Sequence, residues 1–525
     1  MATLDLILAF LATGLVYLLY RTLHNQRSRN VAHKPPGPRP WPIVGNLFDM
    51  PRHTEWETFS NWAKTYGTTS PYLTPQSDVV YVNIVGRPMI ILNTLEAASD
   101  LLGGRSAIYS DRPYFPLVDW IGHPEFNFGF MPYGKAWKEH RKIFVNGYKQ
   151  LSNYYDAHYF ATMTALRNFR DDPEHYAKHT KLHAGQAIIA ATYGTEVDKF
   201  SDPLIETAER VMSDIGVALL PVLWIFNPVP LLKHLPNWLG GSYVAKVTAK
   251  CKQSLADLQH VPFNQTKSAL ASGIYKYSFT SYLLQQAESN TAAGAEREDL
   301  ENTIRSLAAV AYGAASDTTV AAEEIFLLAM ALHPEIQERA QKEIDSVIDG
   351  DRLPKFEDRE RLPYISAIMK ETMRWHSPVP AGIPHMLSRD DYYKGHFLPA
   401  GSTVVGNIWN ILHDPEIFEN PMEFQPQRFL SSMDQDAGSE TPSKMEQARR
   451  ATFGFGRRAC PGRLFAEDGL WLLFAQFLSV FSVSSDPKGP RPELKFTSGS
   501  LSHPVPFQPI IRVRSESRAA LLRID

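Results

Sequence analysis

The chain has 525 residues, 44% of them hydrophobic and 21% charged, so it is long and apolar enough to bury a large core. Its formal net charge of −3 and its isoelectric point near 6.6 give no basis for binding nucleic acid. Only two cysteines occur, Cys251 and Cys460, which excludes a disulfide framework and favours a reducing compartment. The sequence has no internal repeat and no glycine-rich nucleotide signature, so we expect no flavin or nucleotide domain.

Residues 2–20 form an apolar run that contains a single charge, Asp5. As a helix this run would be about 28 Å long, which matches the hydrocarbon thickness of a bilayer. A cleaved signal peptide is the alternative, but the run has no basic segment before it and no small-residue cleavage site after it. Basic residues, beginning with Arg21, follow the run and place the main body in the cytosol. We therefore expect a single membrane anchor over residues 1–20.

A basic and proline-rich linker is expected over residues 21–46. Its second half, PPGPRPWPIVGN, cannot be helical at this density of proline, and an extended, stiff spacer fits it best. A proline-rich ligand for another protein is the alternative interpretation. We expect one globular domain to follow, over residues 47–525.

Several segments of this domain have patterns of their own. Residues 79–93 carry β-branched runs around a Gly-Arg-Pro turn and predict a hairpin, and segments 379–386 and 401–411 also predict strands. The aromatic-rich stretch 110–134 predicts an irregular loop packed on the core. Residues 215–241 are apolar but divided by prolines, so they are either internal packing or a surface that dips into lipid.

A long, alanine-rich helix is predicted over about 300–331, and it contains the sequence GAASDTT. Asp317 and Thr318 are unusual there because both residue types compete with helical hydrogen bonding. Thr318 could bond back to a carbonyl and bend the helix. Alternatively, the acid and the hydroxyl together could pass protons inward from water.

Two further pairs have an ordinary structural interpretation when taken alone. Trp137 and Arg141 are four residues apart, so they share one face of a helix and could simply stack. Glu371 and Arg374 are three apart in KETMRW, and such a pair is normally a surface salt bridge worth less than about 1 kcal/mol. A second arginine, Arg428, follows in PQRF.

The stretch FGFGRRACPG, residues 453–462, places Cys460 on a glycine-rich loop before an apolar segment that predicts a buried helix. Arg457, Arg458 and the amide groups of a helix start all favour a thiolate. Taken alone, a cysteine in such a place is more often a small buried hydrophobe.

Five positions of this loop give F-x-x-G-x-R-x-C-x-G, which resembles the haem-binding loop of the cytochrome P450 superfamily at every fixed position. They are Phe453, Gly456, Arg458, Cys460 and Gly462. The other motifs stand in the same order as in that family, and the resemblance extends from the proline-rich hinge to the C-terminus. It implies a mainly α fold with small β-sheets, haem b as cofactor and the Cys460 thiolate as the iron ligand. The local sequences FMPYGKAWKEHRK and PHMLSRDDYYKG resemble those of fungal microsomal members of the family that act in secondary metabolism.

The resemblance also implies roles for other residues. Trp137 and Arg141 would bind one haem propionate, and His385 would bind the second. Asp317 and Thr318 would deliver protons, although Ala315 stands where the family usually has glycine. Residues 497–507 would line the substrate site. A buried structural lock would form from three residues, Glu371, Arg374 and Arg428.

The implied activity is a monooxygenase that inserts one oxygen atom from O2 into a C–H bond of an apolar small molecule, for example in fungal terpenoid biosynthesis. Implied partners are a membrane-bound NADPH–cytochrome reductase and the bilayer, with no nucleic acid. The implied location is the endoplasmic reticulum membrane, with the catalytic domain in the cytosol. The alternatives are a haem-thiolate isomerase or dehydratase that does not use O2, a xenobiotic-oxidising enzyme, and a non-catalytic haem-binding or sensing protein.

Overall fold

The computed structural model describes residues 33–67, 77–115, 118–119, 127–218, 241–289, 295–430 and 442–523. The anchor expected over residues 1–20, the first part of the expected linker and nearly all of 215–241 lie outside these ranges. Among the described helices, none combines the length and the apolar character needed to cross a membrane.

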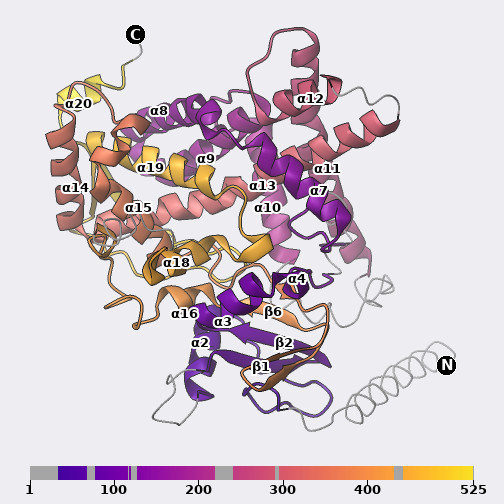
Figure 1. Ribbon diagram of the computed structural model, residues 1–525. Helices are drawn as coiled ribbons and strands as arrows, with labels where there is room; N and C mark the ends of the chain where they lie inside the picture. Colours follow the sequence, from indigo (N-terminus) through magenta and orange to yellow (C-terminus); the bar gives the residue numbers. More distant parts are fainter. Residues whose placement is uncertain are drawn as a thin grey trace.

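The described chain is mainly helical, with small β-sheets, as the sequence predicted. Most of the long helices occupy the upper part of Figure 1, and the largest sheet lies below them together with α2. The longest helix is α13, Ala295–Leu332, which runs through the middle of the helical part. The other helices of ten or more residues are α2 (Glu55–Thr65), α7 (Lys135–Gly147), α8 (Tyr155–Asp171), α9 (Tyr176–Tyr193), α10 (Pro203–Ala218), α11 (Gly241–Ala271), α12 (Phe279–Ser289), α14 (Pro334–Val347), α15 (Pro363–Trp375) and α19 (Arg463–Val480). The short helices are α3 (Leu95–Ala98), α4 (Ser106–Tyr109), α16 (Ile408–Leu412), α18 (Lys444–Arg450) and α20 (Glu516–Ala520).

The largest sheet has the strand order β1-β2-β6-β3. The hairpin expected over 79–93 is present as an antiparallel pair, and its turn consists of Val85 and Gly86, which both have positive φ angles of 49° and 80°. β2 pairs with β6 in parallel, and β6 pairs with β3 antiparallel. The four strands are β1 (Val79–Ile84), β2 (Arg87–Leu92), β3 (His385–Met386) and β6 (Thr403–Gly406). Two further hairpins are β4 (Asp391–Tyr393) with β5 (His396–Leu398), and β7 (Phe481–Ser485) with β8 (Pro509–Val513).

The strand prediction for 401–411 was too long, because β6 ends at Gly406 and α16 follows at once. The side chain of Asn407 accepts a hydrogen bond from the amide of Asn410 and so caps the new helix. The strand predicted over 379–386 is likewise reduced to the two residues of β3. An alternating apolar pattern does not distinguish a strand from a short buried helix that starts at such a cap.

The described part of the linker, residues 33–46, lies along β1. The amide of Tyr81 on β1 donates to the carbonyl of Pro36 at 2.9 Å. A Cβ atom added at Gly37 would lie 2.0 Å from the carbonyl oxygen of Tyr81, so only glycine permits this approach. The proline-rich segment is therefore packed on the domain instead of standing apart from it as a spacer.

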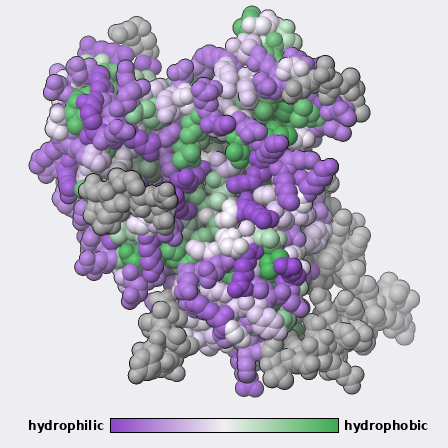
Figure 2. All heavy atoms as spheres, viewed as in Figure 1, coloured by the Kyte–Doolittle hydropathy of each residue, from purple (hydrophilic) through white to green (hydrophobic). Residues whose placement is uncertain are grey.

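The core of the helical part is built around α13, which packs against α9 and α19. Between α13 and α19, the rings of Phe326 and Phe474 stack with centroids 3.8 Å apart. Figure 2 shows a mostly hydrophilic outer face, with apolar residues gathered in a hollow in its middle. Aromatic stacking and apolar burial thus hold the central helix in a fixed position against the helix that follows Cys460.

Candidate active site

The loop that carries Cys460 has a backbone that depends on glycine. The amide of Cys460 donates to the carbonyl of Phe453 at 2.7 Å, which closes the loop. Gly456 has a φ angle of 54°, and a Cβ atom there would lie 2.1 Å from the carbonyl oxygen of Leu102. Gly462 is the residue from which α19 begins. The fixed glycines of the motif therefore set the direction in which the sulfur points.

The side chain of Cys460 is accessible, yet many protein atoms surround it. Both observations fit a thiol that lines a concave space within the protein. Burial raises the pKa of this thiol, while the amide of Gly462 and the guanidinium groups of Arg141 and Arg463 lower it. A thiol that coordinates a metal ion loses its proton outright, so binding of iron would produce the thiolate.

The arginines that the sequence placed beside the sulfur point elsewhere. Arg457 donates to the hydroxyl group of Tyr133. Arg458 donates to three backbone carbonyls, those of Ser110, Phe128 and Met131, at 2.7–2.9 Å. Its guanidinium is buried, and burial lowers its pKa to about 10.

A second buried guanidinium, Arg112, lies close to Arg458. It donates to the carbonyls of Gly129, Ile383 and Pro384. Burial lowers its pKa, and the charge of Arg458 adds to this effect. Within the described residues, neither arginine forms an ion pair with a carboxylate. Two buried like charges without such a partner are costly, so this region fits an anionic ligand.

Trp137 and Arg141 lie on α7 next to the same loop. Arg141 donates to the carbonyl of Ala459 at 2.6 Å, and the guanidinium of Arg458 lies 4.6 Å from the centre of the Trp137 ring. The Nε1 atom of Trp137 is buried and has no hydrogen-bond partner in the described chain. Because this free donor lies beside the buried guanidinium of Arg458, the two together fit an anionic acceptor that the protein atoms do not supply.

His385, the first residue of β3, is buried, and its Nδ1 atom lies 2.7 Å from the carbonyl oxygen of Tyr109. Because a carbonyl can only accept, Nδ1 carries the proton in this contact. Burial lowers the pKa of His385 to about 3, and the charges of Arg112 and Arg458 contribute. In this state the ring is neutral and its Nε2 atom has no proton to donate to a propionate.

The donor set fits haem b. A haem carries two propionates, and this region offers buried positive charges together with the unpartnered indole N–H of Trp137. The sulfur of Cys460, a soft metal ligand, lies on the adjoining loop and lines a concave space. Cys460, Trp137, Arg141 and Arg458 are thus brought to one region, as the resemblance implied, and Arg112 belongs to it as well.

Asp317 and Thr318 lie in a more accessible part of the buried helix α13. Residues 306–313 and 320–323 are buried, whereas residues 314–319 are partly or fully exposed. The hydroxyl of Thr318 donates to the carbonyl of Ala314 at 2.9 Å, and the carboxylate of Asp317 lies 3.5 Å from Nε2 of His503. Both side chains are therefore accessible within an otherwise packed helix.

The structure brings Glu371, Arg374 and Arg428 together in the interior. Arg374 makes two hydrogen bonds to the carboxylate of Glu371, at 2.7 and 2.8 Å, and Arg428 reaches the same carboxylate at 3.3 Å. The amide of Gln425 donates to it as well, at 2.7 Å. Glu371 and Arg374 are both 0% exposed, so the interpretation as a surface salt bridge does not apply.

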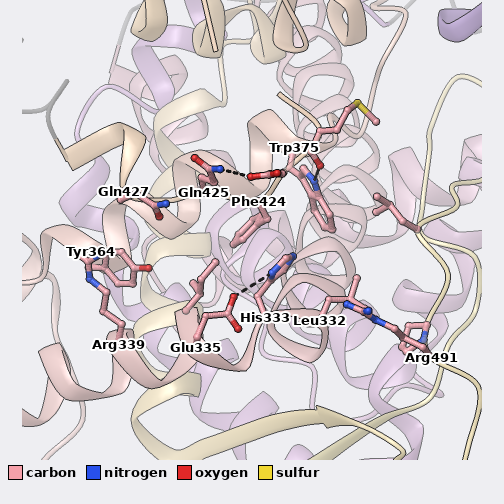
Figure 3. A pocket seen from close by; sticks show the side chains of 15 residues that line it. Leu332, His333, Glu335, Arg339, Tyr364, Trp375, Phe424, Gln425, Gln427 and Arg491 are labelled. Carbon is pink, nitrogen blue, oxygen red and sulfur yellow. Dashed lines mark hydrogen bonds and ion pairs between the residues drawn. The ribbon is translucent and has the colours of Figure 1, made fainter. Parts of the chain in front are cut away.

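A pocket of about 680 Å³ lies beside this cluster and is shown in Figure 3. In the figure His333 points toward Glu335, and Trp375 and Phe424 form part of the wall. None of the residues assigned above to haem or to proton delivery lines it. This pocket is separate from the candidate active site.

Sequence reasoning missed two residues of the site. Arg112 follows Ser-Asp and precedes proline in the aromatic-rich stretch, where an arginine among apolar residues was the available signal. His503 lies in the stretch 497–507 that the sequence had assigned to the substrate site, but its contact with α13 had no local signal.

Comparison with known proteins agrees with this geometry. A family model described as Cytochrome P450 matches residues 35–511. Cytochrome P450 monooxygenase COX1 of Coprinopsis cinerea is 36% identical over 499 residues, which cover 93% of each chain. Cytochrome P450 monooxygenase 208 of Postia placenta is 35% identical over 99% of this chain and 97% of its own, and cytochrome P450 monooxygenase claT of Ampulloclitocybe clavipes is 37% identical over 97% of each. The chain therefore belongs to the cytochrome P450 family and is a P450 monooxygenase with haem b as its cofactor.

Proposed function

We propose that this monooxygenase inserts one oxygen atom from O2 into a C–H bond of an apolar small molecule, in a fungal secondary-metabolite pathway such as terpenoid biosynthesis. The observation that carries the proposal is the accessible stretch 314–319 in the buried helix α13, where Asp317 and Thr318 lie. An acid and a hydroxyl have no structural need to be there, because neither stabilises a helix interior. The fungal relatives support the assignment to a fungal pathway.

The residues that would hold the haem come from four parts of the chain. Cys460 would bind the iron, and Phe453, Gly456 and Gly462 give its loop the required shape. Trp137 and Arg141 from α7, together with Arg458 and Arg112, would bind the propionates. His385 would join them as an imidazolium, because the negative charge of a propionate beside the ring would raise its pKa. When bound, haem supplies the oxidation of the C–H bond, using O2 and two electrons from outside.

Proton delivery falls to Asp317 and Thr318 in this proposal. The hydroxyl of Thr318 donates its hydrogen bond to the carbonyl of Ala314, so its lone pairs remain free to accept a hydrogen bond from a proton donor. The side chain of Asp317 is partly exposed, so water can reach it. The same bond to Ala314 also fits a purely structural role for Thr318, so an experiment must separate the two interpretations.

The Thr318→Ala variant makes that separation. We expect the free energy of unfolding and the haem content to stay nearly unchanged. The amount of product per NADPH should fall several-fold, and the amount of hydrogen peroxide per NADPH should rise by the corresponding amount. Thr319→Ala, the next residue of the same helix, is the control and should keep the wild-type ratio. An unchanged ratio of product to NADPH in Thr318→Ala would mean that this hydroxyl is structural.

The reaction class is tested by asking whether the reaction requires O2 and NADPH. Membranes that contain the enzyme and a reductase would be incubated with terpenoids, steroids, polyketides and simple aromatics under ¹⁸O2. We expect one labelled oxygen atom in the product and no conversion without NADPH. Conversion under nitrogen without NADPH would instead support an isomerase or a dehydratase.

The partners and the location also belong to this proposal. An external reductase is needed because the sequence has no flavin or nucleotide signature, and α7 offers it the exposed cations Lys135, Lys138 and Lys142. Residues 1–20 would anchor the chain, residues 21–46 would connect, and residues 47–525 would form the catalytic domain on the cytosolic side of the endoplasmic reticulum. Glu371, Arg374 and Arg428 would act as a structural lock.

A further inference from the structure

His503 lies between two acidic residues of α13. Its Nδ1 atom is 3.0 Å from Oε2 of Glu324, and its Nε2 atom is 3.5 Å from Oδ1 of Asp317. The two acids are seven residues apart, or about two helical turns, so they lie on the same face of the helix. One imidazole ring therefore connects Glu324 with the acid assigned to proton delivery.

The turn that carries His503 is held firmly. The amide of His503 donates to the hydroxyl of Thr497, and the amide of Thr497 donates back to the carbonyl of His503. The neighbouring Ser502 contacts Nε2 of His376 at 2.7 Å, and the ring of His376 stacks on Phe496 at 3.5 Å. These contacts fix the position of the imidazole relative to α13.

The charges around His503 favour its protonated form. Burial lowers its pKa, but Asp317 and Glu324 outweigh this effect and raise the pKa to about 9. Among the described residues, the other groups whose charge acts on His503 or Glu324 are His376, Tyr176 of α9 and Glu323. Burial lowers the pKa of His376, burial and the charge of Glu324 raise the pKa of Tyr176 to about 12, and burial raises the pKa of Glu323. His376 and Tyr176 are therefore neutral near pH 7, and His503 is the cation among these described residues.

We infer that His503 is a positioning residue. Its imidazolium holds the carboxylate of Asp317 between the C-terminal turn and α13, in the position from which Asp317 passes protons to Thr318. The inference rests on the proposed function for Asp317 and Thr318. The side chains of His503, Asp317 and Glu324 are 23%, 30% and 13% exposed, so the cluster has access to water.

The first test measures charge and not turnover. In the folded protein the pKa of His503 is above its unfolded value of about 6.5, so its stabilising effect is complete below that pH and is lost as the pH rises through about 9. The melting temperature of the haem-loaded wild type should therefore exceed that of His503→Gln most strongly near pH 6, and the two should converge above about pH 10. His503→Lys, which keeps the charge, should restore part of the difference at low pH.

The matched control is Lys495→Gln, which removes a cation of the same segment that pairs with the exposed Glu493. Its melting temperature should follow the wild type at each pH. If the difference between wild type and His503→Gln does not depend on pH, His503 is neutral and the inference is wrong.

The second test measures coupling, with the panel compound that the wild type oxidises fastest. His503→Gln should release several-fold more peroxide per NADPH than the wild type, Lys495→Gln should not, and His503→Gln should add nothing further in an Asp317→Asn background. If Thr318→Ala uncouples while His503→Gln behaves like the wild type, the proposed function survives and this inference fails. If Thr318→Ala does not uncouple, the proposed proton route fails first, and the melting curves still decide whether His503 holds Asp317.

Discussion

The indole Nε1 of Trp137 is a buried donor without a partner in the described chain, and leaving such a group unpaired costs about 1–3 kcal/mol. A haem propionate would remove this cost. The Trp137→Phe variant should therefore act differently on two forms of the protein. We expect the haem-free form to lose little stability or none, and the haem-loaded form to release haem several-fold faster to an excess of a haem-binding protein.

Trp471 on α19 provides the control. It is 0% exposed, and its Nε1 atom also has no partner among the described residues, but it packs against Phe356, away from the Cys460 loop. Trp471→Phe removes the same atoms, the unpaired N–H group included, from a core position, so it reports the effect of losing them where no haem contact is proposed. Equal rates of haem loss in the two variants would show that the Trp137 donor does not bind haem.

Residue-level prediction from the sequence is strongest where the determinant is local. Cys460 and its glycines could be found because a tight loop before a helix leaves a fixed spacing in the chain. Arg112 could not be assigned, because its partners Gly129 and Pro384 come from distant segments. The pairing of His503 with Glu324 was hidden for the same reason, since 179 positions separate them.

At the scale of elements, the buried carboxylate of Glu371 joins α15 to the segment that carries Arg428. Glu371→Ala would leave two guanidinium groups in the interior without their counter-charge, and breaking a buried ion pair in this way typically costs about 3–5 kcal/mol. That loss is a large part of the stability of an ordinary domain. We expect little folded, haem-loaded protein from this variant.

The control for Glu371→Ala is Glu338→Ala on α14, which breaks an exposed pair with Lys342. This variant should give the wild-type yield of folded, haem-loaded protein, because exposed ion pairs add little stability. Normal expression and turnover of Glu371→Ala would contradict the assignment of a structural lock.

Elements were predicted well where the pattern was long. The helix expected over about 300–331 is α13, and the apolar segment after Cys460 is α19. The segment 401–411 failed because the cap at Asn407, and not the alternation of apolar residues, decides where α16 begins. The accessible stretch within α13 could not be read from the sequence, since its exposure depends on which neighbours leave it uncovered.

At the scale of the whole molecule, the order of the motifs identified the family and hence the mainly α fold. The substrate could not be identified in this way. Substrate selectivity depends on the shape of a surface that distant segments form together, and local spacing does not encode that shape. The closeness of residues 33–46 to β1 was likewise unexpected, because the glycines that allow it act on a strand far along the chain.

The central claim is that the thiolate of Cys460 binds the haem iron, and the most direct measurement is the absorption spectrum of the reduced protein with carbon monoxide. We predict the red-shifted Soret band of thiolate-ligated haem for the wild type and its loss in Cys460→Ser. Cys251→Ser, which changes the other cysteine, should keep the band. Retention of the red-shifted band in Cys460→Ser, or its absence from the haem-loaded wild type, would contradict the assignment.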